Sequence, residues 1–390
     1  MAHTFHRDRF TLLAYLFLAF YGYFINVLGP ITPFLKDELK LSYTVAGLHY
    51  TAFAVGILLV GLGGHLVIRR LGSWRSLWAG ALGISLSTVL LLIGKTPLIT
   101  IGACFLMGSV GSLILAIVPS ALSEQYGELR AVALSEANVI ASAVAAGAPL
   151  LVGWSARWAG SWRLALASVA LAPILMYIIF RKDPSPVQAS GGGFPAQAGR
   201  SLPLLYWVYW VAIVLGVAVE FCIISWSANY LETVLGMLRA DAAQSVSLFL
   251  VAMMLGRLLG GHLVRIFSIH KLLIASILVA IAGYLLFWLT DSISLALGGL
   301  FVAGLGVASL YPLIISLAIG AVPDDTVQAS ARATLASGTA ILTLPLILGR
   351  LADSVGIRLA FGIVALLLVC VFAIIRFTAR AVPAHPLVVG

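Results

Sequence analysis

Long apolar runs, separated by short polar connections, fill almost the whole chain of 390 residues. A helix that crosses a bilayer needs about 20 predominantly apolar residues, and twelve runs approach or exceed that length. These runs lie at 10–34, 46–68, 75–94, 97–122, 131–153, 163–181, 204–228, 244–265, 270–290, 294–320, 331–350 and 358–378. The pattern predicts an all-α membrane protein with twelve transmembrane helices.

Composition leads to the same class. Hydrophobic residues make up 62% of the chain and charged residues 9%, whereas a soluble domain carries about 25% charged residues. Lipid can solvate this apolar surface, provided that the backbone hydrogen bonds close within the protein. The net charge of +9 comes from basic residues spread over the connections rather than gathered in one patch. We therefore expect the lipid bilayer, and not nucleic acid, as the partner.

The second half of the chain repeats features of the first. The sequence Gly-Gly-His-Leu-Val occurs at 63–67 and again at 260–264, and Pro149 and Pro345 lie at nearly the same spacing. A polar stretch rich in Pro and Gly separates the sixth run from the seventh, at the midpoint. Six helices in each half place both halves in the same orientation. We predict two pseudo-symmetric six-helix bundles at 1–181 and 204–390, joined by a cytoplasmic linker at 182–203.

The distribution of basic residues predicts the orientation. In the connections and at the ends of the runs, thirteen Lys and Arg residues lie on the side of the two chain ends, and eight lie on the opposite side. Cytoplasmic connections are enriched in Lys and Arg. We expect both termini in the cytoplasm, in a bacterial inner membrane.

Four short motifs point to a known family. Residues 64–72 read Gly-His-Leu-Val-Ile-Arg-Arg-Leu-Gly after the second run, and 349–356 read Gly-Arg-Leu-Ala-Asp-Ser-Val-Gly after the eleventh. Residues 146–149 read Ala-Gly-Ala-Pro, and the first run carries Asn-x-x-Gly-Pro-x-x-Pro at 26–33. Together with the two halves of six runs, these motifs resemble the major facilitator superfamily over essentially the whole chain.

This resemblance implies two bundles that open a central site alternately to each side of the membrane, with the first, fourth, seventh and tenth helices around it. Members of the family typically carry an acidic residue in the first connection, where this chain has Ile68 or Arg69. Any latch between the halves must then use other residues. Ala148 and Pro149 also stand in place of the Gly-Pro pair that is associated with antiporters.

Four charged residues fall inside the predicted spans, and such residues are functional candidates because charge is costly in lipid. They are Glu136, Glu220, Arg257 and Arg332. Glu220 lies well inside the seventh run, where burial favours the neutral form of a carboxylic acid. It is our first candidate for carrying a coupling proton, with Glu136 as the second. Glu220 could equally bind a cationic substrate or serve as a structural hydrogen-bonding group.

Glu136 and Arg257 lie near the cytoplasmic ends of the fifth and eighth runs, which face each other across the halves in the resembled fold. We predict that they form a cytoplasmic gate, although pairing of Arg257 within its own half is an alternative. Arg332, which is the counterpart of Glu136 in the repeat, either joins this gate or binds an anionic group of the substrate.

Three uncharged or aromatic side chains complete the predicted substrate site together with Glu220. Asn26 is an amide in mid-membrane that suits a hydroxylated solute, and Tyr23 and Trp226 are the aromatic residues that we expect to line a pocket. No metal site is expected, because Cys104, Cys222 and Cys370 lie far apart and show no metal-ligand spacing.

These features favour a monomeric secondary transporter without a cofactor, which moves a small organic solute by alternating access. No Gly-x-x-x-x-Gly-Lys-Ser/Thr loop is present, so a gradient of protons or another coupling ion must supply the energy. We predict a sugar-like or other polar metabolite as the substrate. The alternative is a proton-driven efflux antiporter for amphiphilic compounds. A membrane-embedded enzyme and a receptor or channel are less consistent with the missing catalytic motifs and with the repeat.

Overall fold

The computed structural model describes residues 6–180, 202–322 and 326–381, and within these ranges it contains helices and no strand. The first half comprises α1 (Arg9–Glu38), α2 (Tyr43–Leu71), α3 (Ser73–Ile93), α4 (Pro97–Tyr126), the 3-10 turn Gly127–Leu129, α5 (Arg130–Trp158), α6 (Arg163–Ala170) and α7 (Ala172–Phe180). The second half comprises α8 (Leu204–Leu235), α9 (Arg239–Leu263), α10 (Ile269–Leu289), α11 (Ile293–Val307), α12 (Leu310–Gly320), α13 (Thr326–Val355), α14 (Ile357–Ala360) and α15 (Gly362–Ala381).

Eleven helical segments of the described chain are long and apolar enough to cross a membrane. One of them, Pro97–Trp158, contains both α4 and α5, so the helices make twelve crossings. The predicted all-helical architecture of twelve spans is therefore confirmed. Proline accounts for two interrupted spans: Pro173 and Pro312 lack the N–H that would continue the helix from the preceding turn, and α7 and α12 begin just before them.

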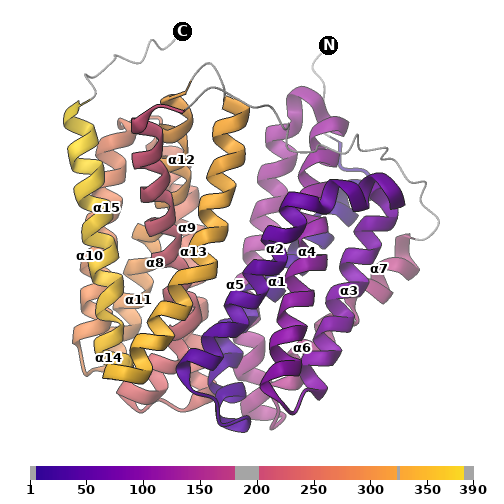
Figure 1. Cartoon of the computed structure of the whole chain (residues 1–390), viewed down its shortest axis with the longest axis horizontal. Helices are drawn as coiled ribbons and strands as arrows, with labels where there is room; N and C mark the ends of the chain where they lie inside the picture. Colours follow the sequence, from indigo (N-terminus) through magenta and orange to yellow (C-terminus); the bar gives the residue numbers. More distant parts are fainter. Residues whose placement is uncertain (1–5, 181–201, 323–325, 382–390) are drawn as a thin grey trace.

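The helices form two bundles that lie side by side (Figure 1). One bundle, coloured from indigo to the pink of α7, contains α1 to α7, and the other, coloured from red to yellow, contains α8 to α15. Each bundle has its own buried apolar core. Almost all residues of each core come from the helices of that bundle. The predicted linker at 182–203 falls almost entirely outside the described residues, so its boundaries stay a prediction.

The two sides of the membrane can be named from the helix ends. We call the side where α1 begins and α15 ends the terminal face, which is uppermost in Figure 1, and the opposite side the distal face. The bundles meet through α1 against α8, α2 against α13 and α5 against α9. Gly29 allows the first of these contacts, because an added Cβ would overlap the carbonyl oxygen of Ile224 on α8.

Candidate functional site

A cavity lies between the two bundles and consists of two adjoining parts. The inner part, of about 130 Å³, is lined by residues of α1, α5, α8 and α9, among them Asn26, Glu220 and Arg257. The outer part has a volume of about 760 Å³ and shares Arg257 and Asn138 with the inner part. Its wall reaches Ile269 at the start of α10, so it extends toward the terminal face. We refer to both parts together as the central cavity.

An ion pair occupies the wall that the second bundle contributes. Arg257 Nη2 on α9 donates to Glu220 Oε1 on α8 at 3.5 Å. The Glu220 side chain is 16% exposed and that of Arg257 is 45% exposed, so the guanidinium faces the cavity more than the carboxylate does. Pairing reduces the cost of placing two charges in the membrane. The long contact leaves most of the N–H groups of Arg257 available to a bound solute.

The first bundle contributes a wall of uncharged polar groups. Asn26 on α1 donates from its Nδ2 to the carbonyl oxygen of Gly22 at 2.9 Å. Asn138 on α5 donates in the same way to Leu134 at 2.7 Å, and Ser142 lies one turn further along α5. Each amide therefore bonds to the preceding turn of its own helix and keeps its oxygen for another partner. A solute in this cavity can contact both bundles at once.

Two of the predicted substrate-binding residues lie away from the central cavity. The hydroxyl of Tyr23 donates to the carbonyl oxygen of Ala165 inside the first bundle at 2.9 Å, and Tyr23 is buried. Trp226 is fully buried and donates from its Nε1 to the carbonyl oxygen of Pro345 at 3.0 Å. A transmembrane helix can carry apolar or aromatic residues on the side that faces lipid, on the side that faces the bundle core and on the side that faces a cavity. The residue type alone therefore did not show which side Tyr23 and Trp226 occupy.

The expected Glu136–Arg257 pair is not formed in this conformation. Glu136 accepts hydrogen bonds from Arg7 Nε at 2.8 Å and from the hydroxyl of Tyr15 at 3.2 Å, both within the first bundle. Arg257 pairs with Glu220 instead. Each of the two residues therefore pairs within its own bundle, which for Arg257 is the alternative that the sequence left open.

Arg332 also stays within its own bundle. Its guanidinium lies over the ring of Trp207 on α8, 5.5 Å from the ring centre. The backbone carbonyl of Arg332 accepts a hydrogen bond from Trp210 Nε1 at 2.9 Å. Both of these contacts lie within the second bundle, and Arg332 is not among the described residues that line the central cavity.

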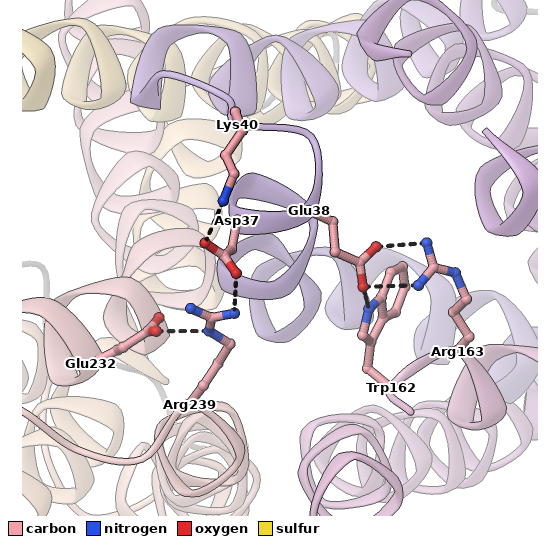
Figure 2. A network of polar contacts seen from close by, with 7 residues as sticks. All are labelled: Asp37, Glu38, Lys40, Trp162, Arg163, Glu232 and Arg239. Atoms are coloured by element: carbon pink, nitrogen blue, oxygen red, sulfur yellow. Dashed lines mark hydrogen bonds and ion pairs between the residues drawn. The ribbon is translucent and has the colours of Figure 1, made fainter. Parts of the chain in front are cut away.

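On the distal face, the bundles are joined by charged residues that were not predicted. Arg239 at the start of α9 pairs with Asp37 at the end of α1 at 3.1 Å, as Figure 2 shows. Arg157 of α5 pairs with Asp241 of α9 at 2.6 Å. These residues lie at helix ends, where charge is readily hydrated, so a search for charges inside the spans passes over them.

Asp353 forms a second kind of distal contact. This residue of α13 accepts hydrogen bonds from the backbone N–H groups of Tyr43 and Thr44, each at 2.8 Å. Its carboxylate also accepts from the hydroxyl of Thr44 at 2.5 Å. A side chain of the second bundle thus caps the first turn of α2 in the first bundle, where the N–H groups have no partner within the helix. The motif at 349–356 therefore supplies a link between the bundles.

Comparison with known proteins agrees with this architecture. The model of the Major Facilitator Superfamily matches residues 12–323 and 239–388. The chain belongs to the major facilitator superfamily. It is accordingly a multi-pass integral membrane protein from a family of transporters.

Two relatives show how far the similarity extends. A glucose/galactose transporter of Brucella abortus is 28% identical over 376 residues, which cover 90% of each chain. An uncharacterised MFS-type transporter of Yersinia pestis is 26% identical over 376 residues, which cover 92% of this chain and 94% of that protein.

Solved structures share the fold. A bacterial homologue of the human lysosomal transporter Spinster, in an inward-facing and occupied conformation, superposes with a TM-score of 0.82 over 97% of this chain and 98% of that one. The two sequences are 17% identical. The likeness shows the fold alone.

Proposed function

We propose that this protein is a proton-coupled secondary transporter of a small polar solute such as a sugar, with the central cavity as its binding site. The observation that carries the proposal is the Glu220–Arg257 pair, which lines the same cavity as the amides of Asn26 and Asn138. We infer that the terminal face is cytoplasmic, because it holds the larger number of Lys and Arg residues. The central cavity then opens inward in a bacterial inner membrane, and the monomer is the functional unit.

The ion pair suggests how a proton and a solute are coupled. A solute oxygen that accepts a hydrogen bond from Arg257 competes with Glu220 for the same guanidinium. A carboxylate that loses its cationic partner in a poorly hydrated site binds a proton more readily. Solute binding therefore favours protonation of Glu220, and by linkage protonation of Glu220 favours solute binding. This reciprocity is what a symporter requires.

The polar wall of the first bundle supports a hydroxylated solute. Amide and hydroxyl groups such as those of Asn26, Asn138 and Ser142 both donate and accept hydrogen bonds, as sugar hydroxyls do. The glucose/galactose transporter of Brucella abortus aligns over 90% of the chain. D-Glucose and D-galactose are therefore the first solutes to test.

One observation favours the alternative of proton-driven efflux of amphiphilic compounds. The outer part of the central cavity is large, and its wall includes Val139, Leu258 and Leu313 from both bundles. An apolar surface of this kind would accommodate the hydrocarbon part of an amphiphile. The direction of proton-driven movement distinguishes the two functions.

The test uses purified protein in liposomes with an imposed pH gradient. Wild-type protein should accumulate radiolabelled D-galactose or D-glucose in response to the gradient. Glu220→Gln should abolish this accumulation but retain exchange of labelled for unlabelled sugar, because the variant keeps the cavity and loses the titrating group. Glu128→Gln is the matched control, since Glu128 lies on the 3-10 turn between α4 and α5 and away from the cavity wall.

Two outcomes would contradict the proposal. Full gradient-driven accumulation by Glu220→Gln would exclude Glu220 as the proton carrier. If wild-type protein moves neither sugar but extrudes a lipophilic cation against its gradient, the efflux alternative holds instead.

A further inference from the structure

A second cavity, of about 520 Å³, lies on the distal face between the end of α1, the end of α8 and the start of α9. We call it the distal vestibule. Its polar wall comprises Lys36, Asp37, Lys40, Asn229, Glu232, Thr233 and Arg239. None of these residues lines the central cavity, and both bundles contribute to the wall. The volume lies within the range of about 300–1,000 Å³ that is usual for small-molecule sites.

Arg239 holds two carboxylates in place at the vestibule. Its Nη1 bonds to Asp37 Oδ2 at 3.1 Å and its Nε to Glu232 Oε1 at 2.7 Å (Figure 2). Lys40 adds a weaker contact to Asp37 Oδ1 at 3.4 Å. A carboxylate can accept about four hydrogen bonds, so both acidic side chains keep acceptor capacity. The site thus presents fixed acceptors whose charge is already balanced.

Asn229 supplies an unused donor at the same cavity. The residue is 2% exposed, and its Nδ2 has no hydrogen-bond partner within the part of the chain that the structure describes. Buried amide groups are nearly always hydrogen-bonded, so a solute in the vestibule would supply the acceptor that this donor lacks among the described residues. Lys36 is a further donor, because its ammonium lies over the ring of Tyr43 at 4.0 Å and forms no ion pair with a carboxylate of the described residues.

We propose that the distal vestibule binds a neutral polyhydroxylated solute of hexose size. It does so in the conformation described here, in which the two bundles are in contact on the distal face. Sugar hydroxyls would donate to the carboxylates of Asp37 and Glu232 and accept from the amide of Asn229 and the ammonium of Lys36. Each hydroxyl both donates and accepts, which matches a wall that offers both kinds of partner.

A purely anionic ligand fits the vestibule less well. The basic side chains of the wall number three and the acidic ones two, and the strongest base, Arg239, is already occupied by both acids. A free anion would meet little net charge and two carboxylates.

The inference takes only the solute class from the proposed function, and a separate measurement tests it.

The test is protection of an engineered cysteine against a maleimide that cannot cross the membrane. Thr233→Cys places a thiol on the exposed wall of the vestibule, and Cys370→Ser removes the one native cysteine that is not buried. The protein is reconstituted in liposomes and labelled from the distal side, with D-galactose as the probe and glycine betaine as the osmotic control. At about ten times the dissociation constant, D-galactose should slow labelling about tenfold.

Matched variants assign any protection to the vestibule. Asn229→Leu, which keeps the branched shape of the side chain but has no amide, should remove the protection. Glu232→Gln should weaken it and provides a second variant if the first does not fold. Asn138→Leu, which removes a proposed hydrogen-bonding group from the central cavity, should leave the protection intact. Leu238→Cys, 69% exposed and outside the vestibule wall, should label at the same rate with and without sugar.

Three results would overturn the inference. They are no protection by D-galactose, protection by D-galacturonate alone, and protection that survives Asn229→Leu but is lost in Asn138→Leu. The last would mean that sugar in the central cavity changes the distal face from a distance. Failure of wild-type protein to accumulate D-galactose would contradict the proposed function and leave this measurement unaffected.

Discussion

Replacing Asp353 by alanine should shift the protein away from the conformation described here and toward one that is open on the distal face. The carboxylate of Asp353 accepts hydrogen bonds from two backbone N–H groups and one hydroxyl at the start of α2. These contacts join the two bundles, so they exist only when the distal face is closed. Ser42 still accepts from the N–H of Val45 at 3.3 Å, so α2 keeps a cap of its own after the substitution.

The size of the shift follows from known capping energies. Loss of a helix N-cap costs about 0.5–2 kcal/mol, and the exposure of Asp353 argues for a value inside that range rather than above it. A loss of about 1.4 kcal/mol changes an equilibrium constant about tenfold. If the distal-open state holds about 1% of wild-type molecules, it should hold nearly a tenth of the variant.

Distances between two spin labels measure these populations. Leu98 at the distal end of α4 and Leu359 in α14 are 82% and 66% exposed and belong to different bundles. Cysteines at both positions, in a chain with Cys370→Ser, carry the labels. Double electron–electron resonance in nanodiscs should show a longer-distance population that grows in Asp353→Ala.

Ser354→Ala is the control, because the hydroxyl of Ser354 donates to the carbonyl oxygen of Leu351 in its own helix at 2.8 Å and makes no recorded hydrogen bond to the other bundle. This variant should keep the wild-type distance distribution. If Asp353→Ala also keeps it, or if both variants shift equally, then the cap does not stabilise the closed distal face.

Three further substitutions test other contacts. Gly29→Ala should also enlarge the distal-open population in the same spin-label measurement, because the added Cβ would overlap the carbonyl oxygen of Ile224 across the bundles. Gly108→Ala creates a similar overlap with the carbonyl oxygen of Phe53 inside the first bundle, so it should lower the melting temperature without changing that population. Glu136→Gln should leave proton-driven uptake into liposomes within a few-fold of wild type, because an exposed ion pair such as Arg7–Glu136 contributes about 0–1 kcal/mol to stability. Complete loss of uptake would show that Glu136 takes part in transport.

The sequence predicted part of the central cavity. Asn26, Glu220 and Arg257 come from the first, seventh and eighth predicted spans, and they line the same space. The criterion that found the two charges was their cost in the membrane, which holds whatever the tertiary structure. The same criterion selected Glu136, which lies close enough to the end of α5 to pair with Arg7 outside the spans.

Side-chain direction was much harder to predict. In a soluble helix, polar residues mark the outer face, but in a bilayer the lipid-facing side is as apolar as the core. Tyr23 and Trp226 therefore gave no sign that they point into a bundle core and toward α13 rather than into the cavity. The same ambiguity applies to every aromatic residue of the spans.

Hydropathy and the internal repeat by themselves determined that this chain crosses the membrane twelve times in two related halves, because lipid accepts an apolar helix regardless of its neighbours. Only the tertiary structure decided which residues meet across the halves. Asp353 caps a helix that begins about 310 positions earlier in the chain, and Arg239 reaches Asp37 over 202 positions. Such contacts depend on the packing of whole bundles, which no local pattern of residues along the chain encodes.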